Sequence, residues 1–286
     1  MKPVSEWNES YLGELIKLGV QESLILDYKG SASLGKDSKK TNDISKDVSS
    51  FANSAGGILV YGMLEDKHVP TAIDVGVDRN QTTKEWLESI IKSWIQPVVE
   101  DLVVKPIDVP TKGKDMVIYA VEIGAATSRA PHQAFDHRYY KRFNFESAPM
   151  EDYEVRDLMR RSLEYGKKYG AAWDLNVEVE RLIAAVHERG QIDGGQYAPR
   201  ARLAIGVSNA LRSAGSVMAL FPKSLRSEVA QLIKQVDQYN SVIETVDPGR
   251  REEARLTDRL KMDLANIMQT GFAITGTLAS ILDREP

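Results

Sequence analysis

The sequence predicts an α+β protein in two parts: a mixed α and β domain over residues 1–155, followed by an all-α helical domain over residues 156–286. Three observations support this division. Runs of alternating apolar residues, which are typical of strands, lie before residue 155. Glycine and proline punctuate the same part of the chain densely. Beyond residue 155, apolar residues recur at helical spacing instead.

The first elements follow from local patterns. Apolar residues at helical spacing predict a helix over residues 7–19. Residues 23–29 alternate and predict a half-buried strand, one face of which carries Asp27 and Lys29. Residues 30–42 are rich in glycine, serine and lysine, so we expect a mobile loop. A helix is predicted over residues 43–53, capped by Asn42 or Asp43, with Ile44, Val48, Phe51 and Ala52 facing the core.

A glycine pair separates this helix from the next strand. Gly56 and Gly57 supply a turn with positive φ, and Gly57 also allows a neighbouring backbone to pass closely. The elements expected after it are a strand over 58–61, a helix over 83–95, a hairpin of strands 101–109 and 116–123, and a strand over 137–142.

The second half predicts four or five helices with breaks at Gly190–Pro199, Phe221-Pro222 and Asp247–Gly249. Its apolar residues form two stripes. The first, over residues 225–239, is nearly heptad, so it indicates either an internal core or a seam for a homo-oligomer. The stripes consist of Leu225, Val229, Leu232, Ile233, Val236 and Tyr239, and of Leu256, Leu260, Leu264, Ile267 and Met268.

Composition excludes several classes of protein. The 286 residues include no cysteine, so disulfides, cysteine-ligated zinc and Fe–S clusters are excluded. No run approaches the roughly 18 apolar residues of a membrane span. We therefore expect a cytoplasmic protein that does not enter a membrane. The formal net charge is −4, so any attraction to nucleic acid must come from local basic patches.

Four residues form a candidate catalytic group: Glu22, Asp27, Lys29 and Glu65. Converging carboxylates repel unless a cation or a raised pKa compensates for them. Carboxylates beside a lysine suit metal-assisted phosphodiester chemistry. We expect Glu22, Asp27 and Glu65 to hold Mg²⁺ or Mn²⁺, and Lys29 to stabilise charge on a phosphate. The alternative is that Asp27 pairs with Lys29 on an exposed strand face while Glu65 lies in a solvated turn.

Basic residues cluster in two stretches, from which we select Lys39, Lys40, Lys141 and Arg142 as candidate contacts to a nucleic-acid backbone. A solvated surface is the alternative. Neighbouring strand residues point to opposite faces, so Lys141 and Arg142 do not both face one ligand. The segment Asn53–Gly57 lacks the strand–loop–helix order and the lysine of a Walker A loop, so we interpret it as a turn. The four histidines show no metal-ligand spacing, and a histidine acid or base has no support from the sequence.

Three blocks resemble a known family. They are Glu22-Ser-x-x-x-Asp27-Tyr-Lys29, then Phe51-Ala-Asn-Ser-Ala-Gly-Gly-Ile-Leu-Val-Tyr-Gly62, and then Tyr139-Tyr-Lys-Arg142 with Pro149 shortly after. Their order and spacing resemble the Schlafen AlbA-2 domain over about residues 10–160. The helical half resembles no family that we can name.

The resemblance implies a mixed α/β nucleic-acid-binding module. In Schlafen proteins with RNase activity, two glutamates five residues apart and one later acidic residue form the catalytic cluster, which here corresponds to Glu22, Asp27 and Glu65. The chain departs from that pattern with aspartate at the second position and glutamate at the third. The implied activity is a metal-dependent endoribonuclease acting on structured RNA such as tRNA, with RNA favoured over DNA and a role in stress or phage defence.

Two other functions remain open. The same surface would serve a non-catalytic regulator that binds DNA or RNA. A structural protein that assembles through its helical half is the third possibility.

Overall fold

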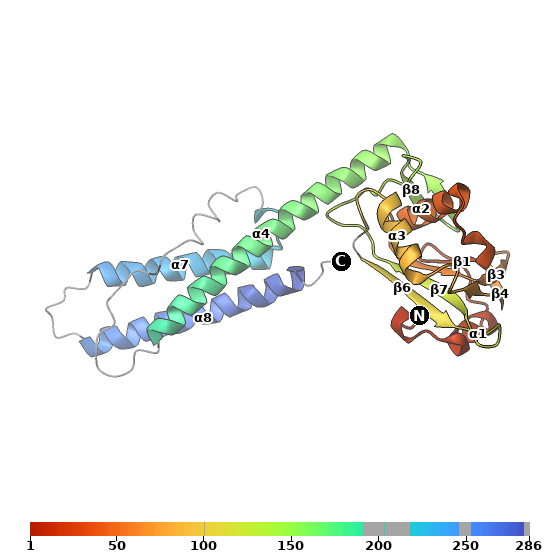
Figure 1. The fold of residues 1–286 in the computed structure, drawn as a ribbon. Helices are drawn as coiled ribbons and strands as arrows, with labels where there is room; N and C mark the ends of the chain where they lie inside the picture. Colours follow the sequence, from red (N-terminus) through yellow and green to blue (C-terminus); the bar gives the residue numbers. More distant parts are fainter. Residues whose placement is uncertain (100, 191–202, 204–217, 246–252, 283–286) are drawn as a thin grey trace. The chain divides into compact units, whose positions relative to one another are not determined.

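The computed structural model describes residues 1–99, 101–190, 203, 218–245 and 253–282. The chain divides into two compact units, Met1–Glu164 and Tyr165–Glu285. The first unit contains helices and strands and the second is helical, so the predicted fold class is confirmed (Figure 1). The division between the units lies within a helix, α4, that runs from Asp152 to Gly190.

A five-stranded sheet forms the centre of the first unit. Its strands are β1 (Leu26–Lys29), β2 (Gly57–Tyr61), β5 (Val77–Asp78), β6 (Leu102–Asp108) and β7 (Met116–Ile123). β1 runs parallel to β2, whereas β2, β5 and β6 all pair antiparallel with β7. β2 and β5 follow each other along one edge of β7, and β6 occupies the other edge. The predicted hairpin of residues 101–109 and 116–123 is confirmed as β6 and β7.

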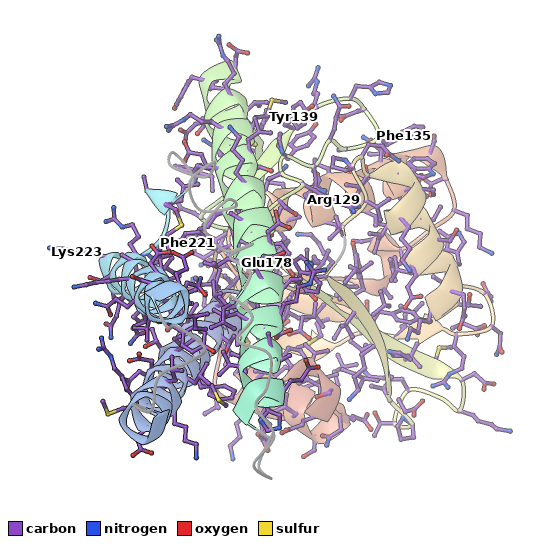
Figure 2. All side chains as sticks on the ribbon, turned by 90° about the vertical axis from the view of Figure 1, so that its left-hand side faces the viewer. Arg129, Phe135, Tyr139, Glu178, Phe221 and Lys223 are labelled. Atoms are coloured by element: carbon purple, nitrogen blue, oxygen red, sulfur yellow. The ribbon has the colours of Figure 1, made fainter. Side chains whose placement is uncertain are left out.

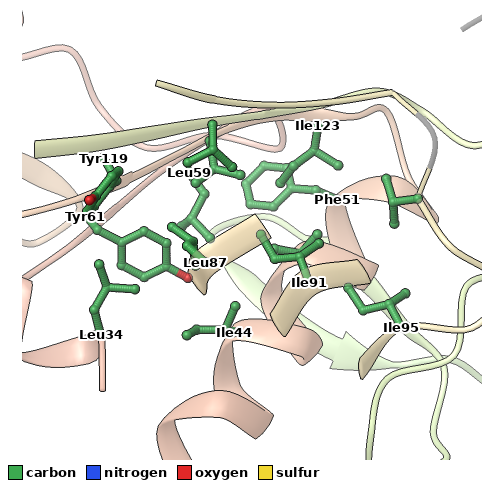
Figure 3. Close-up of a cluster of buried hydrophobic side chains, with 14 of the residues drawn as sticks. Leu34, Ile44, Phe51, Leu59, Tyr61, Leu87, Ile91, Ile95, Tyr119 and Ile123 are labelled. Carbon is green, nitrogen blue, oxygen red and sulfur yellow. The ribbon is translucent and has the colours of Figure 1, made fainter. Parts of the chain in front are cut away.

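Both faces of the sheet are covered. Leu59 and Tyr61 of β2 point into a core with α2 (Ser38–Ala52) and α3 (Lys84–Trp94), as Figure 3 shows. Ile58 and Val60 point the other way, into a core with α1 (Glu9–Lys17) and the short 3-10 helix Val4–Glu6. This alternation with period 2 is what a strand buried on both sides requires.

The prediction that residues 30–42 form a loop is wrong in its second half. α2 begins at Ser38, because the Asp37 side chain accepts a hydrogen bond of 3.0 Å from the Lys40 N–H and caps the helix there. Asn42 and Asp43, the expected caps, lie inside α2. Lys39 and Lys40 are consequently held in the first helical turn. A 3-10 helix, Ser31–Ser33, precedes them.

The first strand also differs from its prediction. β1 begins at Leu26, three residues later than expected, and Leu24 and Ile25 are exposed. Its second face is buried at Asp27, which is fully inaccessible to solvent, and partly exposed at Lys29. The expected close approach at Gly57 is confirmed: φ is +145°, and an added Cβ would lie 2.5 Å from the Ile25 carbonyl oxygen.

Two small hairpins complete the first unit. β3 (Met63–Asp66) pairs with β4 (Val69–Ile73), and β8 (Tyr140–Phe143) pairs with β9 (Glu146–Pro149). The strand expected over 137–142 begins only at Tyr140. His137 has a φ of +64°, which places it in a turn rather than in a strand.

The second unit is described as three long helices: α4, α7 (Lys223–Thr245) and α8 (Glu253–Leu282). The predicted break at Phe221-Pro222 is confirmed directly before α7. The other two predicted breaks lie outside the described residues. Phe221 is buried, while Lys223 points away from the start of α7 (Figure 2).

None of the helices in the described part of the chain is long and apolar enough to cross a membrane.

The first apolar stripe belongs to the core of the helical unit. Its side chains are buried together with residues of α4 and α8, so this stripe is occupied within the chain. The buried members are Leu225, Val229, Leu232, Val236 and Tyr239.

Candidate functional site

Glu22 lies just ahead of β1 and is 5% exposed. Its Oε1 accepts a hydrogen bond of 2.9 Å from the Tyr28 N–H, and its Oε2 lies 2.7 Å from Nδ1 of His68. The backbone N–H of Glu22 also donates to the His68 carbonyl oxygen at 2.8 Å. Burial raises the pKa of Glu22, and the neighbouring Asp27 carboxyl raises it further. Glu22 is therefore a buried acid that is fixed to the β3–β4 turn.

The β3–β4 turn consists of Lys67 and His68, whose φ angles are +49° and +65°. Two consecutive residues with positive φ between paired strands form the turn that matches the twist of a hairpin. The Glu65 carboxylate accepts a hydrogen bond of 2.6 Å from the His68 N–H. This local geometry directs the imidazole of His68 toward Glu22.

Glu22, Glu65 and His68 bring three potential ligand atoms within 4.8 Å of one another. Two carboxylate oxygens and an imidazole nitrogen are a donor set that fits a divalent cation. Opposite ligands of such a cation are separated by about 4 to 5 Å, which is twice a bond of about 2.0–2.6 Å. The exposed Glu65 side chain is able to adjust to an ion. The structure thus brings together two of the three predicted metal ligands and adds His68.

Asp27 lies next to Glu22 but has other partners. Its Oδ1 is 2.9 Å from Lys29 Nζ, and its Oδ2 is 3.1 Å from Arg142 Nη1. Both Asp27 and Arg142 are buried. Asp27 thus pairs with Lys29, as the alternative interpretation of the sequence predicts. Asp27 is buried, however, and does not lie on an exposed face. Two cations therefore neutralise Asp27.

Arg142 is directed inward from β8. Besides Asp27, its guanidinium donates to the Ser23 carbonyl oxygen at 3.3 Å and lies 4.5 Å from the centre of the Phe51 ring. Among the described residues, its Nε has no hydrogen-bond partner. The side chain is 1% exposed. In this arrangement Arg142 acts as an internal counterion for Asp27, whereas the sequence assigned it to a phosphate.

Lys29 lies between two buried carboxylates. Burial lowers its pKa, but Asp27 and Asp47 outweigh that effect and the net pKa is raised. Asp47, on α2, accepts a hydrogen bond of 2.8 Å from the Ser147 hydroxyl. Burial raises the pKa of Asp47, and Asp27 adds to the rise. Lys29 therefore stays protonated at neutral pH, because both neighbouring carboxylates favour its charged form.

A groove of about 590 Å³ lies beside these charges. It holds five cationic and four acidic side chains, so its surface is mixed rather than uniformly basic. Lys141 is outside it and pairs with Glu154 in the first turn of α4. The charged residues of the lining are Lys29, Lys39, Lys40, Lys46 and Arg142, and Asp37, Asp43, Asp47 and Glu146.

Phe145 connects the groove to the group of potential metal ligands. It lines the groove, and its ring stacks on the imidazole of His68 with centroids 4.2 Å apart and planes 15° apart. Lys29 makes the second connection, since it also lines the groove and binds Asp27, the neighbour of Glu22. The group Glu22, Glu65 and His68 and the groove therefore form one continuous region.

Residues 22–151 match the family model described as Schlafen, AlbA_2. This part of the chain is a Schlafen AlbA_2 domain. The family suggests nucleic-acid binding. The AlbA_2 domain includes the three potential metal ligands, the ion pair of Asp27 and Arg142, and the whole groove.

Comparisons with individual proteins add little. No curated protein matches the chain significantly. Among solved structures, the crystal structure of the DIP2311 protein from Corynebacterium diphtheriae is similar to it at 16% sequence identity, with a TM-score of 0.34. The match covers 54% of this chain and 29% of that chain, so it spans less than a third of that protein.

Two residues of the AlbA_2 domain escaped the sequence interpretation. His68 shows no metal-ligand spacing to another histidine, although it follows Glu65 by three residues in a sequence that closes a tight hairpin. Asp47 was assigned to no site, because a carboxylate on a helix carries no signal until the facing strands are known. His68 was therefore recognisable in principle from the turn, whereas Asp47 was not.

Proposed function

We propose that this protein binds RNA in the groove and cleaves it with the help of Mg²⁺ or Mn²⁺, as an endoribonuclease of the Schlafen type acting on structured RNA such as tRNA. One observation carries the proposal: Glu22, Glu65 and His68 adjoin a lysine-lined groove through Phe145 and Lys29. RNA is preferred over DNA on the family resemblance.

Each part of the site has a role in this proposal. Lys39 and Lys40, fixed in the first turn of α2, guide the nucleic-acid backbone along the groove. Lys29 provides positive charge at the scissile phosphate. Phe145 offers a ring on which a base can stack.

The acids of the site have different tasks. A divalent cation held there would polarise a phosphoryl oxygen and lower the pKa of a water molecule. Glu22 and Glu65 supply oxygen ligands for it. Asp27 acts as a positioning residue, because it holds Lys29 in its protonated form and raises the pKa of Glu22.

A second candidate function is a regulator that binds DNA or RNA without cutting it. The neutralisation of Asp27 by Lys29 and Arg142 favours this alternative, since the acid at the second position of the family's catalytic pattern is already bound. Such a regulator would use the groove alone.

The experiment that tests the proposed function is a cleavage assay on tRNA with Mn²⁺ or Mg²⁺, comparing the wild type with a Glu22→Gln, Glu65→Gln variant. Asp66→Asn is a matched control, because Asp66 is an exposed acid in the same hairpin. Cutting by the wild type and the control, but neither by the double variant nor in the presence of a chelator, is the expected result. Salt-dependent binding by all three proteins without any cleavage would replace the nuclease with the regulator.

A further inference from the structure

We propose that His68 takes the ligand position that the family pattern assigns to Asp27, and that the site consequently prefers Mn²⁺ and similar transition-metal ions to Mg²⁺. This inference rests on the metal-assisted function proposed above and specifies its cation. The ligands are then Glu22, Glu65 and His68, with Asp27 as an internal counterion.

Asp27 is poorly placed to bind a metal ion. Both of its oxygens contact cationic groups, and its side chain is completely buried. Binding a metal would require Asp27 to release Lys29 or Arg142. Release of Arg142 would leave a guanidinium that is 1% exposed without its carboxylate, which is strongly unfavourable. The ion pair therefore removes Asp27 from the set of available ligands.

His68 is held where a ligand is needed. Its Nδ1 shares a hydrogen bond of 2.7 Å with Oε2 of Glu22, and an ion would take the place of the proton between them. Neighbouring ligands of an octahedral ion with bonds of about 2.1 Å lie about 3 Å apart, so these two atoms are already close to that spacing. Three contacts fix the histidine: the Glu22 N–H donates to its carbonyl oxygen, its own N–H donates to Glu65, and its ring stacks on Phe145. Glu22, Glu65 and Phe145 therefore fix the position of His68.

The nature of the third ligand decides the preferred ion. Mg²⁺ demands oxygen ligands in near-ideal octahedral geometry and gives up its water reluctantly. Imidazole suits transition metals, and two carboxylates with one imidazole form a mixed oxygen and nitrogen set that Mn²⁺ accepts. The imidazole therefore favours Mn²⁺ over Mg²⁺.

The experiment measures Mn²⁺ binding to the full chain without any substrate. Loss of the free Mn²⁺ signal in electron paramagnetic resonance gives the dissociation constant, and competition with Mg²⁺ gives the preference. The variant is His68→Asn, because asparagine tolerates the φ of +65° at this position. His137→Asn is the matched control, since His137 is an exposed histidine with a φ of +64°.

We expect tighter binding of Mn²⁺ than of Mg²⁺ to the wild type. Loss of an outer-shell partner alone weakens metal binding by about 10–100-fold, so His68→Asn should weaken Mn²⁺ binding by at least about tenfold. The control should not change it. Equal affinity of the wild type for both ions, no Mn²⁺ binding, or a smaller loss in His68→Asn overturns the inference.

A spectroscopic signature makes the test independent of the variant's folding. Electron spin echo modulation detects a histidine nitrogen bound directly to Mn²⁺. Wild-type protein labelled with nitrogen-15 histidine should change the modulation pattern relative to unlabelled protein. An unchanged pattern overturns His68 as a ligand. Failure of the nuclease itself gives a different result, because Mn²⁺ then binds through His68 while tRNA remains intact.

Discussion

Arg142 and Asp27, which are 115 residues apart in the sequence, form an ion pair that is closed off from solvent. The distance from Nη1 to Oδ2 is 3.1 Å, and the two side chains are 1% and 0% exposed. The pair joins β8 to β1. Arg142, from the third motif block of the family pattern, therefore neutralises Asp27, from the first block. Arg142 also lines the groove, and the pair keeps Asp27 from binding a cation.

Removal of the guanidinium should destabilise the first unit severely. Arg142→Ala leaves Asp27 buried with Lys29 as its remaining cation, and breaking a buried pair costs about 3–5 kcal/mol. Urea unfolding followed by tryptophan fluorescence can measure this, because Trp7, Trp86 and Trp94 lie in the first unit. Arg138→Ala is the control at an exposed arginine close by. Equal unfolding midpoints for the two variants would contradict the structural role of Arg142.

Glu22→Gln should stabilise the folded protein at neutral pH. The pKa of Glu22 is raised in the folded state, so its ionised form is less favourable there than in the unfolded chain. Its contribution to stability is fully present below the ordinary pKa of 4.5 and is lost as the pH rises through the folded value. Glutamine keeps an acceptor for the Tyr28 N–H and carries no charge beside Asp27.

The measurement is the free energy of unfolding of wild type and Glu22→Gln from acid to neutral pH. The advantage of the variant should be small in acid and grow toward neutrality. A constant difference across this range would show that the ionisation of Glu22 is not the cause.

The lysines of the groove should determine how nucleic-acid binding depends on salt. In the variant Lys39→Ala, Lys40→Ala, two phosphate contacts are lost. The slope of log affinity against log salt should become shallower by about 1.4 to 1.8, at about 0.7 for each contact on a single strand and about 0.9 on a duplex. Fluorescence anisotropy with labelled RNA at several salt concentrations measures this slope. Lys141→Ala is the control, because Lys141 pairs with Glu154 outside the groove; an equal change of slope in both proteins would disprove the groove as the binding surface.

Gly57→Ala should destabilise the junction of β1 and β2. An added Cβ would lie 2.5 Å from the Ile25 carbonyl oxygen, at a φ of +145° that alanine rarely adopts. Backbone strain of this kind costs about 1–3 kcal/mol. Gly13→Ala in α1 is the matched control, because its Cβ would meet nothing within 4 Å and alanine favours a helix by about 1 kcal/mol. The two variants should shift the unfolding midpoint in opposite directions.

Local patterns in the sequence predicted most of the first unit. Alternation of apolar residues identified β6 and β7, and the glycine pair identified the turn before β2. The predicted start of α2 is wrong because a single side chain, Asp37, caps the helix, which begins five residues earlier, at Ser38. The apolar pattern correctly predicted that Ile44 and Phe51 of α2 face the core.

The candidate site was predicted only in part. The acids Glu22 and Glu65 were identified and do lie together. The burial of Asp27 depends on Arg142, a partner from the far end of the domain, and no periodicity reveals such a pairing. His68 becomes a potential ligand through the positive φ of a hairpin turn and the proximity of the segment before β1. The turn is local and could be recognised from the sequence, but its proximity to the segment before β1 belongs to tertiary structure, which sequence spacing does not encode.

The two adjacent residues Lys141 and Arg142 attach β8 to two different parts of the domain. Lys141 forms an ion pair with Glu154 at the beginning of α4, and Arg142 forms an ion pair with Asp27 in the interior. Because the two ion pairs start from neighbouring residues of one strand, any displacement of β8 would disturb both of them together.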